Sequence, residues 1–463
     1  MTLTVVLLGA VSALPLSVRA QATAPTEVSP KKLLAEARAS LPRVSDEYGT
    51  PIYYLCQMAK IEALLGDQDA AKKTVADIQK RIASRKPPYV DSALQSVLTN
   101  LAYTQSALGE TEAALKTIAT IKDPDTRQMV IAGLVRDRAE VGDIPGVEKA
   151  AQRLKKDEER HRVFGEIIEE RFKAGDMVTA KALLEKELKT PDNAALNLVS
   201  IVRLLIASGD LSTAIQASDA LKESFDYAQT RYIIATAQAK AGDKEAAAKS
   251  MEGLESSSDS SGTMYEIQDL ATLAVAKSAL GDTESAKSIF ADASLKAQKV
   301  DDLMRSECYV AIATAQAETG DTTGAKASMA IAKRIAARQD DFRKGEQLAP
   351  VALAQVQIGD LAGAKETAKL LKERVIVNTR SFPSELAVAL LKAGDEPGAL
   401  AVLAAQPDPF EREEGYTALA VEEVKRGNQA NALQMMGKIR SDSEYLIAAK
   451  LELAATVLKQ NKK

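Results

Sequence analysis

Few residues in this 463-residue chain belong to types that commonly perform chemistry, and the single histidine is the first of them. His161 lies in the segment EERHRVF, at the charged start of an expected helix. A protein metal site needs three or four ligands, and no second histidine or nearby cysteine is present to supply them. We therefore expect His161 at the surface or near a helix end, and we expect no bound metal.

The two cysteines are the next candidates. Cys56 and Cys308 are separated by about six lengths of the repeat described below, and a rigid stack of repeats would hold them too far apart for a disulfide. We expect two buried, unreactive thiols, with pairing to a thiol of another chain as the alternative.

The sequence contains none of the patterns G-x-S-x-G, HExxH, G-x-G-x-x-G or a phosphate-binding loop in a strand–helix context. The sequence thus predicts a protein without catalytic residues or cofactor, and an enzyme with a site assembled across helices is only a minor alternative.

Carboxylates are plentiful, but the most regular of them follow glycine. Eleven times an expected helix ends at a glycine, and nine of these glycines precede an aspartate. Glycine readily adopts the left-handed conformation that ends a helix, and the following carboxylate accepts hydrogen bonds from the next helix's first amides. We interpret these carboxylates as helix caps. The glycines are Gly66, Gly109, Gly142, Gly175, Gly209, Gly242, Gly281, Gly320, Gly359, Gly394 and Gly427.

These glycines recur mostly every 33 to 39 residues, a period typical of helical solenoids. An alanine stands five residues after ten of the glycines and seven residues before eight of them, so paired helices can approach closely. This pattern resembles the tetratricopeptide repeat family over about residues 50–441. The resemblance implies an all-α, right-handed α-α superhelix of about eleven two-helix repeats, with flanking half-repeat helices, over residues 31–461. Unlike most members of that family, the chain uses aliphatic residues where large aromatics are usual.

Single helices are expected at residues 30–41 and 444–459, outside the glycine-marked repeats. We expect them to be polar-faced caps that shield the two ends of an elongated array. The repeats between Gly242 and Gly359 carry about five extra residues each, in a longer second helix or in a longer turn such as 256–262.

The first twenty residues contain an apolar run that is too short for a transmembrane helix and fits a secretory signal peptide. We expect cleavage after Ala20, a disordered lead-in over residues 21–30, and a mature chain without a membrane span in the periplasm or outside the cell. A membrane anchor or a misassigned start remains the alternative, because no basic residue precedes the apolar run.

Surface composition limits the class of partner. The formal charge of −4 and the mixed charged residues exclude the basic stripe that nucleic-acid binding requires. The first helix of each repeat is expected to line the concave face, with the residues 13, 10, 6 and 3 before each glycine on one stripe. In the early repeats this stripe includes Tyr103, Arg136, Arg162 and Arg203, and the arginines could receive acidic side chains or a peptide carboxylate unless Glu169 neutralises them.

In the last three repeats the same stripe is aliphatic. Its residues either pack against adjacent repeats or form an apolar trough for a partner helix or peptide. They are Leu353, Val356, Val388, Leu391, Val421 and Val424.

A long concave surface without a catalytic centre indicates a protein–protein interaction scaffold of a bacterial cell envelope, with proteins or peptides as partners. The alternative is a structural accessory subunit of an envelope enzyme or of a secretion or assembly complex.

Overall fold

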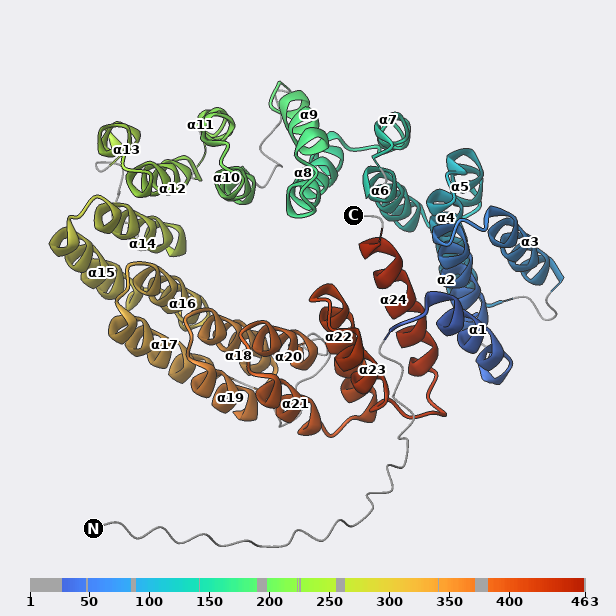
Figure 1. Cartoon of the computed structure of the whole chain (residues 1–463). Helices are drawn as coiled ribbons and strands as arrows, with labels where there is room; N and C mark the ends of the chain where they lie inside the picture. The colour runs from blue at the N-terminus through green and yellow to red at the C-terminus, as the bar shows by residue number, and fades with distance from the viewer. Residues whose placement is uncertain are drawn as a thin grey trace, which may run out of the picture.

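The computed structural model describes residues 27–461 apart from 47–48, 85–88, 141, 190–197, 223, 225, 255–262, 340 and 371–381. The predicted signal peptide and most of the predicted lead-in lie outside these residues. In the described part of the chain, twenty-four α-helices and one 3₁₀ helix form an all-α repeat solenoid without strands (Figure 1).

Eleven helix pairs follow one another along the chain, each with an inner and an outer helix (Figure 1). The inner helices are α2 (Thr50–Leu64), α4 (Asp91–Ala107), α6 (Pro124–Glu140), α8 (Asp157–Lys173), α10 (Leu198–Ala207), α12 (Asp226–Lys240), α14 (Met264–Ala279), α16 (Asp302–Glu318), α18 (Asp341–Gln357), α20 (Phe382–Lys392) and α22 (Pro409–Lys425). The outer helices are α3 (Gln68–Ser84), α5 (Thr111–Ala119), α7 (Ile144–Ala151), α9 (Met177–Glu187), α11 (Leu211–Asp219), α13 (Lys244–Met251), α15 (Thr283–Ala297), α17 (Thr322–Ala336), α19 (Leu361–Leu370), α21 (Glu396–Ala404) and α23 (Gln429–Met436).

The turn within each pair has the predicted geometry. All eleven glycines have φ between +72° and +94°, where a side chain would be strained. Asp243 is representative of the caps, because its carboxylate accepts a hydrogen bond from the backbone N–H of Ala246 at 3.0 Å. Glu110 and Asn428, which follow the two glycines that no aspartate follows, make no capping hydrogen bond through their side chains.

The alanines seven residues before and five residues after the glycine allow the paired helices to approach closely. Ala235 on α12 and Ala247 on α13 are both completely buried, as the alanine pattern predicts. In two of the three 39-residue repeats, the extra residues lengthen the outer helix. Helices α15 and α17 each have 15 residues, against 8 in α13. The extra residues after α13 coincide with 255–262, outside the described residues.

A buried polar pair, which the sequence pattern did not reveal, joins the two helices of several repeats. The oxygen of a glutamine or glutamate four residues before the glycine accepts a hydrogen bond from a threonine or serine eight residues after it. In the pair formed by α18 and α19, the Thr367 hydroxyl lies 2.6 Å from Oε1 of Gln355, and both side chains are buried. The same pair recurs at Glu62–Thr74, Gln105–Thr117, Gln238–Ser250 and Gln316–Ser328.

The solenoid closes on itself, which corrects the prediction of an elongated array with two polar-faced ends. Helix α24 (Tyr445–Gln460) takes the place of an inner helix after α22, and it packs against both α1 (Pro30–Ser40) and α2 (Figure 1). Helix α1 lies on the outer side of α24 and is followed by the 3₁₀ helix η1 (Leu41–Arg43). The two ends of the chain therefore make a twelfth helix pair together.

The faces that pack in this twelfth pair are apolar. Leu33, Leu34 and Ala37 of α1 are buried in one hydrophobic cluster with Leu453 and Ala454 of α24. At the edge of this contact Lys450 of α24 forms a 2.9 Å ion pair with Glu36 of α1. Neither α1 nor α24 could bury its apolar face alone. In the ring, the apolar face of each helix is covered by the other.

The last residues of the predicted lead-in belong to this folded unit. Val28 is 3% exposed, and the Ser29 side chain caps α1 by accepting from the backbone N–H of Lys32. Among the described helices none is long and apolar enough to cross a membrane.

Candidate binding site

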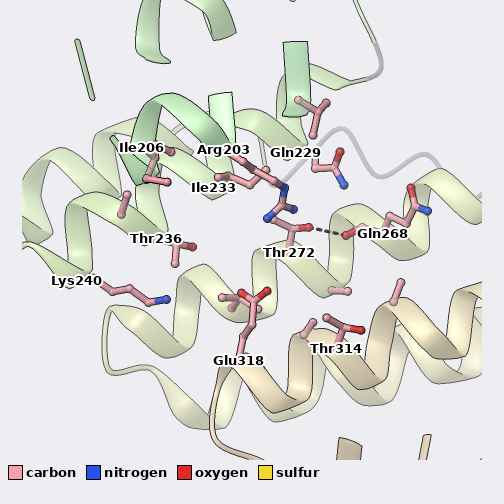
Figure 2. Close-up of a pocket in the computed structure, with 17 residues that line it drawn as sticks. Arg203, Ile206, Gln229, Ile233, Thr236, Lys240, Gln268, Thr272, Thr314 and Glu318 are labelled. Carbon is pink, nitrogen blue, oxygen red and sulfur yellow. Dashed lines mark hydrogen bonds between the residues drawn. The ribbon is translucent and has the colours of Figure 1, made fainter. Parts of the chain in front are cut away.

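A cavity of about 600 Å³ opens on the inner face of the ring between α10, α12, α14 and α16 (Figure 2). Consecutive inner helices pack side by side there, so each of the four contributes residues to one wall. The cavity is a concave surface of the size that holds small ligands or a few residues of a peptide.

The floor of the cavity is apolar. The contributing side chains are short or branched aliphatic groups, which the close helix packing brings together. They are Val199, Ile206, Ala207, Ile233, Ala237, Ala271, Val275, Ala311 and Ala315.

Arg203 supplies a positive charge to the cavity. Its side chain projects from α10 in the direction of Thr272 on α14 (Figure 2). Arg203 is exposed, and among the described residues it has no ion pair or hydrogen bond. A guanidinium with free N–H groups is suited to bind a carboxylate through two parallel hydrogen bonds.

Uncharged polar groups line the same cavity. Thr236, Thr272 and Thr314 each donate the hydroxyl proton to the backbone carbonyl four residues earlier, at 2.8 to 2.9 Å. Their oxygens therefore remain acceptors toward the cavity. The side-chain amides of Gln229 and Gln268 also line it and can both donate and accept (Figure 2).

Charged groups of both signs lie at another part of the rim. Lys240 ends α12 and Glu318 ends α16, and neither has an ion pair within the described part of the chain. With an apolar floor, amide and hydroxyl groups and an unneutralised arginine, the cavity matches the chemistry of an extended peptide.

Of the predicted site residues, Arg203 alone belongs to this cavity. Gln229, Gln268, Thr236 and Thr314 occupy the predicted stripe, 13 or 6 residues before their glycines, although they were not singled out. Ile233, Thr272, Lys240 and Glu318 stand 9 or 2 residues before a glycine, outside the stripe. The accessible inner face is thus wider than a four-position stripe.

Arg136 and Arg162 are neutralised within the protein. Nε of Arg136 donates to Oε2 of Glu166 at 2.7 Å, and Nη1 of Arg162 donates to Oε1 of the same carboxylate. Glu169, which was considered as their neutralising partner, instead lies 3.3 Å from Nζ of Lys173. The three arginines therefore do not form one cluster, and two of them have an internal counter-charge.

Tyr103 is half-buried and packs on the hydrophobic cluster of the first half of the ring. Its ring lies against Gly133 of α6, where a Cβ atom would come within 2.3 Å of the tyrosine oxygen. Burial raises the pKa of the Tyr103 hydroxyl. This residue fills the space between α4 and α6.

The six aliphatic stripe residues pack between repeats. Leu391, Val421 and Val424 are buried, and Leu353, Val356 and Val388 are half-buried against the same hydrophobic cluster as Leu391 and Val424. Packing against adjacent repeats, one of the two alternatives, accounts for their positions.

The histidine is not at the surface, which corrects the expectation from its charged surroundings. His161 is 6% exposed, and its Nδ1 lies 2.5 Å from Oε2 of Glu187, which is also buried. Arg162, the next residue on α8, is exposed, so the charged surroundings in the sequence do not indicate the burial of His161 itself. Cys56 and Cys308 are buried free thiols, and burial raises the pKa of each to about 11.

Comparisons with known proteins add little to this description. No protein-family model matches the sequence, and no curated protein matches it. Among solved structures, one match is described as a "Circular tandem repeat protein with novel repeat topology and enhanced subunit contact surfaces". It covers 94% of this chain and 90% of that chain, with 14% sequence identity and a TM-score of 0.16. The description of the fold therefore rests on the helix pairs of this chain.

Proposed function

We propose that this protein is a non-catalytic interaction scaffold that binds an extended peptide segment of a partner protein on the inner face of its ring. The observation that carries the proposal is Arg203, an arginine with no counter-charge among the described residues, beside an apolar cavity of about 600 Å³. Arg136, which stands at the same repeat position, and Arg162, another arginine of the inner stripe, are both neutralised by Glu166, so this feature of Arg203 is not shared by them.

In this proposal Arg203 binds a carboxylate of the peptide, from its C-terminus or from an acidic side chain. Gln229 and Gln268 pair with peptide N–H and C=O groups, and an apolar side chain next to the carboxylate packs on Ile206 and Ile233. Each of these contacts uses a group that faces the cavity, and none requires the ring to open.

We further propose that the repeats are tetratricopeptide-like and that the chain is exported, with cleavage after Ala20. The glycine and alanine pattern supports the proposal about the repeats. The apolar run of the first twenty residues supports the proposal of export. Mass spectrometry of the purified mature protein tests the export proposal, because a first residue of Gln21 is expected.

The binding proposal is tested by display of random peptides with free C-termini on the purified ring. Selected peptides should share a terminal or acidic carboxylate beside an apolar residue. Arg203→Gln should weaken their binding by roughly 10-fold or more, because a charge-assisted hydrogen bond contributes about 1.5–3 kcal/mol. Arg162→Gln is the matched control, since it removes an arginine that Glu166 already neutralises.

Equal loss in the two variants would contradict the proposed site. A photo-crosslinking residue at Gln229 extends the test to cells, where a set of clients is expected. Recovery of a single stoichiometric complex instead would favour the alternative of a structural accessory subunit.

A further inference from the structure

The closure of the ring creates a second cavity, of about 500 Å³, from the two ends of the chain. Helices α2 and α24 provide most of its wall. Ile61 and Leu64 come from the first of these helices, and Leu451 and Ala455 come from the second. We call this space the seam cavity. It is remote in sequence from the proposed peptide site, and it shares no lining residue with it.

Four charged side chains line the seam cavity, those of Lys60, Asp137, Glu452 and Lys459, and among the described residues Glu452 and Lys60 have no ion-pair partner, whereas Asp137 and Lys459 each have a further interaction. The Glu452 carboxylate belongs to α24, and the Lys60 ammonium belongs to α2. The two groups lie on opposite sides of the seam, and they are not paired with each other. The hydroxyl of Tyr53, also in the lining, has no hydrogen bond to the described residues.

The surroundings of Glu452 disfavour the charged form of its carboxyl group. The side chain is exposed on the cavity side, yet desolvation raises the pKa of its carboxyl group; on the neighbouring helix α22, Lys425 lowers this pKa and Glu414 raises it. Desolvation, with a contribution from the Glu452 charge, also raises the pKa of Tyr53. An incoming ammonium group would therefore remove an unfavourable charge environment.

We propose that the seam cavity binds a small zwitterion with an apolar body, such as an amino acid or a dipeptide with aliphatic side chains. Its ammonium group pairs with Glu452, its carboxylate pairs with Lys60, and its aliphatic part packs on Leu64, Leu451 and Ala455. A simple amine would be repelled by Lys60, and a simple carboxylate would be repelled by Glu452. The opposite charges therefore select a ligand that carries both.

Binding in this cavity is coupled to closure of the ring. Tyr53 and Lys60 belong to the first helix pair and Glu452 belongs to the last inner helix, so the complete site exists only in the closed ring. A ligand that binds the closed ring alone stabilises it by mass action.

The test uses leucine and leucyl-leucine as probes, with isopentylamine and 4-methylpentanoate as the matched single-charge compounds. We expect the zwitterions to raise the melting temperature of the full chain in proportion to the logarithm of their concentration, and the single-charge compounds to have little effect. Lys60→Met and Glu452→Gln should each raise the dissociation constant by 10-fold or more, whereas Lys72→Met, an exposed lysine on α3, should not.

Because a single charge change can disturb folding, the double variant Lys60→Glu/Glu452→Lys is the second measurement. It should bind the zwitterion again in the reversed orientation. The proposal is wrong if the probes do not bind, if the amine binds as tightly as the zwitterion, or if both single variants bind like the wild type. Arg203→Gln should leave zwitterion binding unchanged. The test of the seam cavity is therefore independent of the test of the peptide site.

Discussion

The backbone N–H of Val28 donates a hydrogen bond to Oε1 of Gln429 at 2.7 Å, across 401 residues of sequence. Val28 lies two residues before α1, and Gln429 is the first residue of α23, so two outer helices from opposite ends of the chain begin side by side. A second link of this kind joins the hydroxyl of Tyr54 to the backbone carbonyl of Glu444 at 3.1 Å. The ends of the solenoid are therefore joined by the same kinds of contact that join neighbouring repeats.

The first prediction concerns the closing helix α1. Deletion of residues 1–43 should lower stability by roughly 5 kcal/mol, because it removes buried Leu33 and Leu34 and exposes the apolar face of α24. Small-angle scattering should also show a larger radius of gyration, since the ring loses its seam. Deletion of residues 1–26 is the matched control and should change neither quantity. An unchanged melting temperature for the longer deletion would mean that the seam does not stabilise the ring.

Local rules were sufficient to predict the repeat, but not the ring. The glycine turns and the buried alanines such as Ala235 follow from preferences within about 40 residues of sequence. Closure of the ring depends on the small rotation between successive repeats, added up over the whole array. The sequence of one repeat does not determine this total rotation. The apolar residues of α1 and α24 were visible in the sequence, although nothing in it indicated that each helix covers the other.

The candidate site was predictable only in part for a related reason. Arg203 was identified because it stands on the inner stripe. Whether an arginine has a counter-charge depends on which carboxylates lie near it in the fold. Glu166 of α8 reaches Arg136 on the neighbouring helix α6 and Arg162 on its own helix, whereas Arg203 has no ion pair among the described residues. His161 shows the same limitation, because its buried partner Glu187 is on another helix.

The second prediction concerns the buried polar pair of α18 and α19. Thr367→Val keeps the shape of the side chain but removes the hydroxyl that lies 2.6 Å from Oε1 of Gln355. The variant should lose about 1–3 kcal/mol, because it leaves a buried amide oxygen without its donor. Adding Gln355→Leu should recover part of that loss, since it removes the unsatisfied group. Thermal unfolding of the two variants checks this, and a further loss in the double variant would contradict it.

The third prediction is a pH dependence that arises from Asp269 of α14. Burial, followed by the charges of Asp226 and Glu266, raises the pKa of Asp269 to about 7. In the unfolded chain the pKa is about 3.9, so the folded protein binds the proton more tightly. The stabilisation associated with this proton is present below pH ~4 and is lost as the pH rises through about 7.

Asp269→Asn removes this titration. The variant should therefore melt at a higher temperature than the wild type at pH 8, by an amount equivalent to roughly 1–3 kcal/mol, and at nearly the same temperature at pH 4. Glu245→Gln, which removes an exposed carboxylate on α13, is the control and should show no such dependence. A difference that does not change between the two pH values would show that Asp269 does not titrate in this range.

The fourth prediction is that the effect of Gly133→Ala on stability depends on whether Tyr103 is present. Glycine inside α6 is unfavourable by about 1 kcal/mol relative to alanine, yet an alanine there would collide with the Tyr103 ring. Gly133→Ala should therefore destabilise the wild type by about 1 kcal/mol or more. In a Tyr103→Ala background the same substitution should be stabilising, because the obstructing ring is gone. Melting temperatures of the four proteins in this double-mutant cycle decide the point, and additive effects would contradict the contact.

The last prediction follows from closure itself. If α24 and α1 form a true helix pair, then the position of the chain ends in the ring is arbitrary. A circular permutant that starts at Thr263, continues to Asn461, passes through a flexible Gly/Ser linker to Ser29 and ends at Leu254 should fold. Its new ends fall on either side of residues 255–262, between two successive helix pairs.

We expect the permutant to match the wild type in helix content and radius of gyration, with a melting temperature within a few degrees. The physical reason is that every helix keeps its neighbours, while the former seam becomes an ordinary covalent turn. The matched control carries the same new ends without the linker, as two co-expressed fragments, and it reports how much of the stability depends on that covalent turn. A permutant that is insoluble or partly unfolded, beside fragments that still associate, would show that α1 and α24 do not pair as the repeats do.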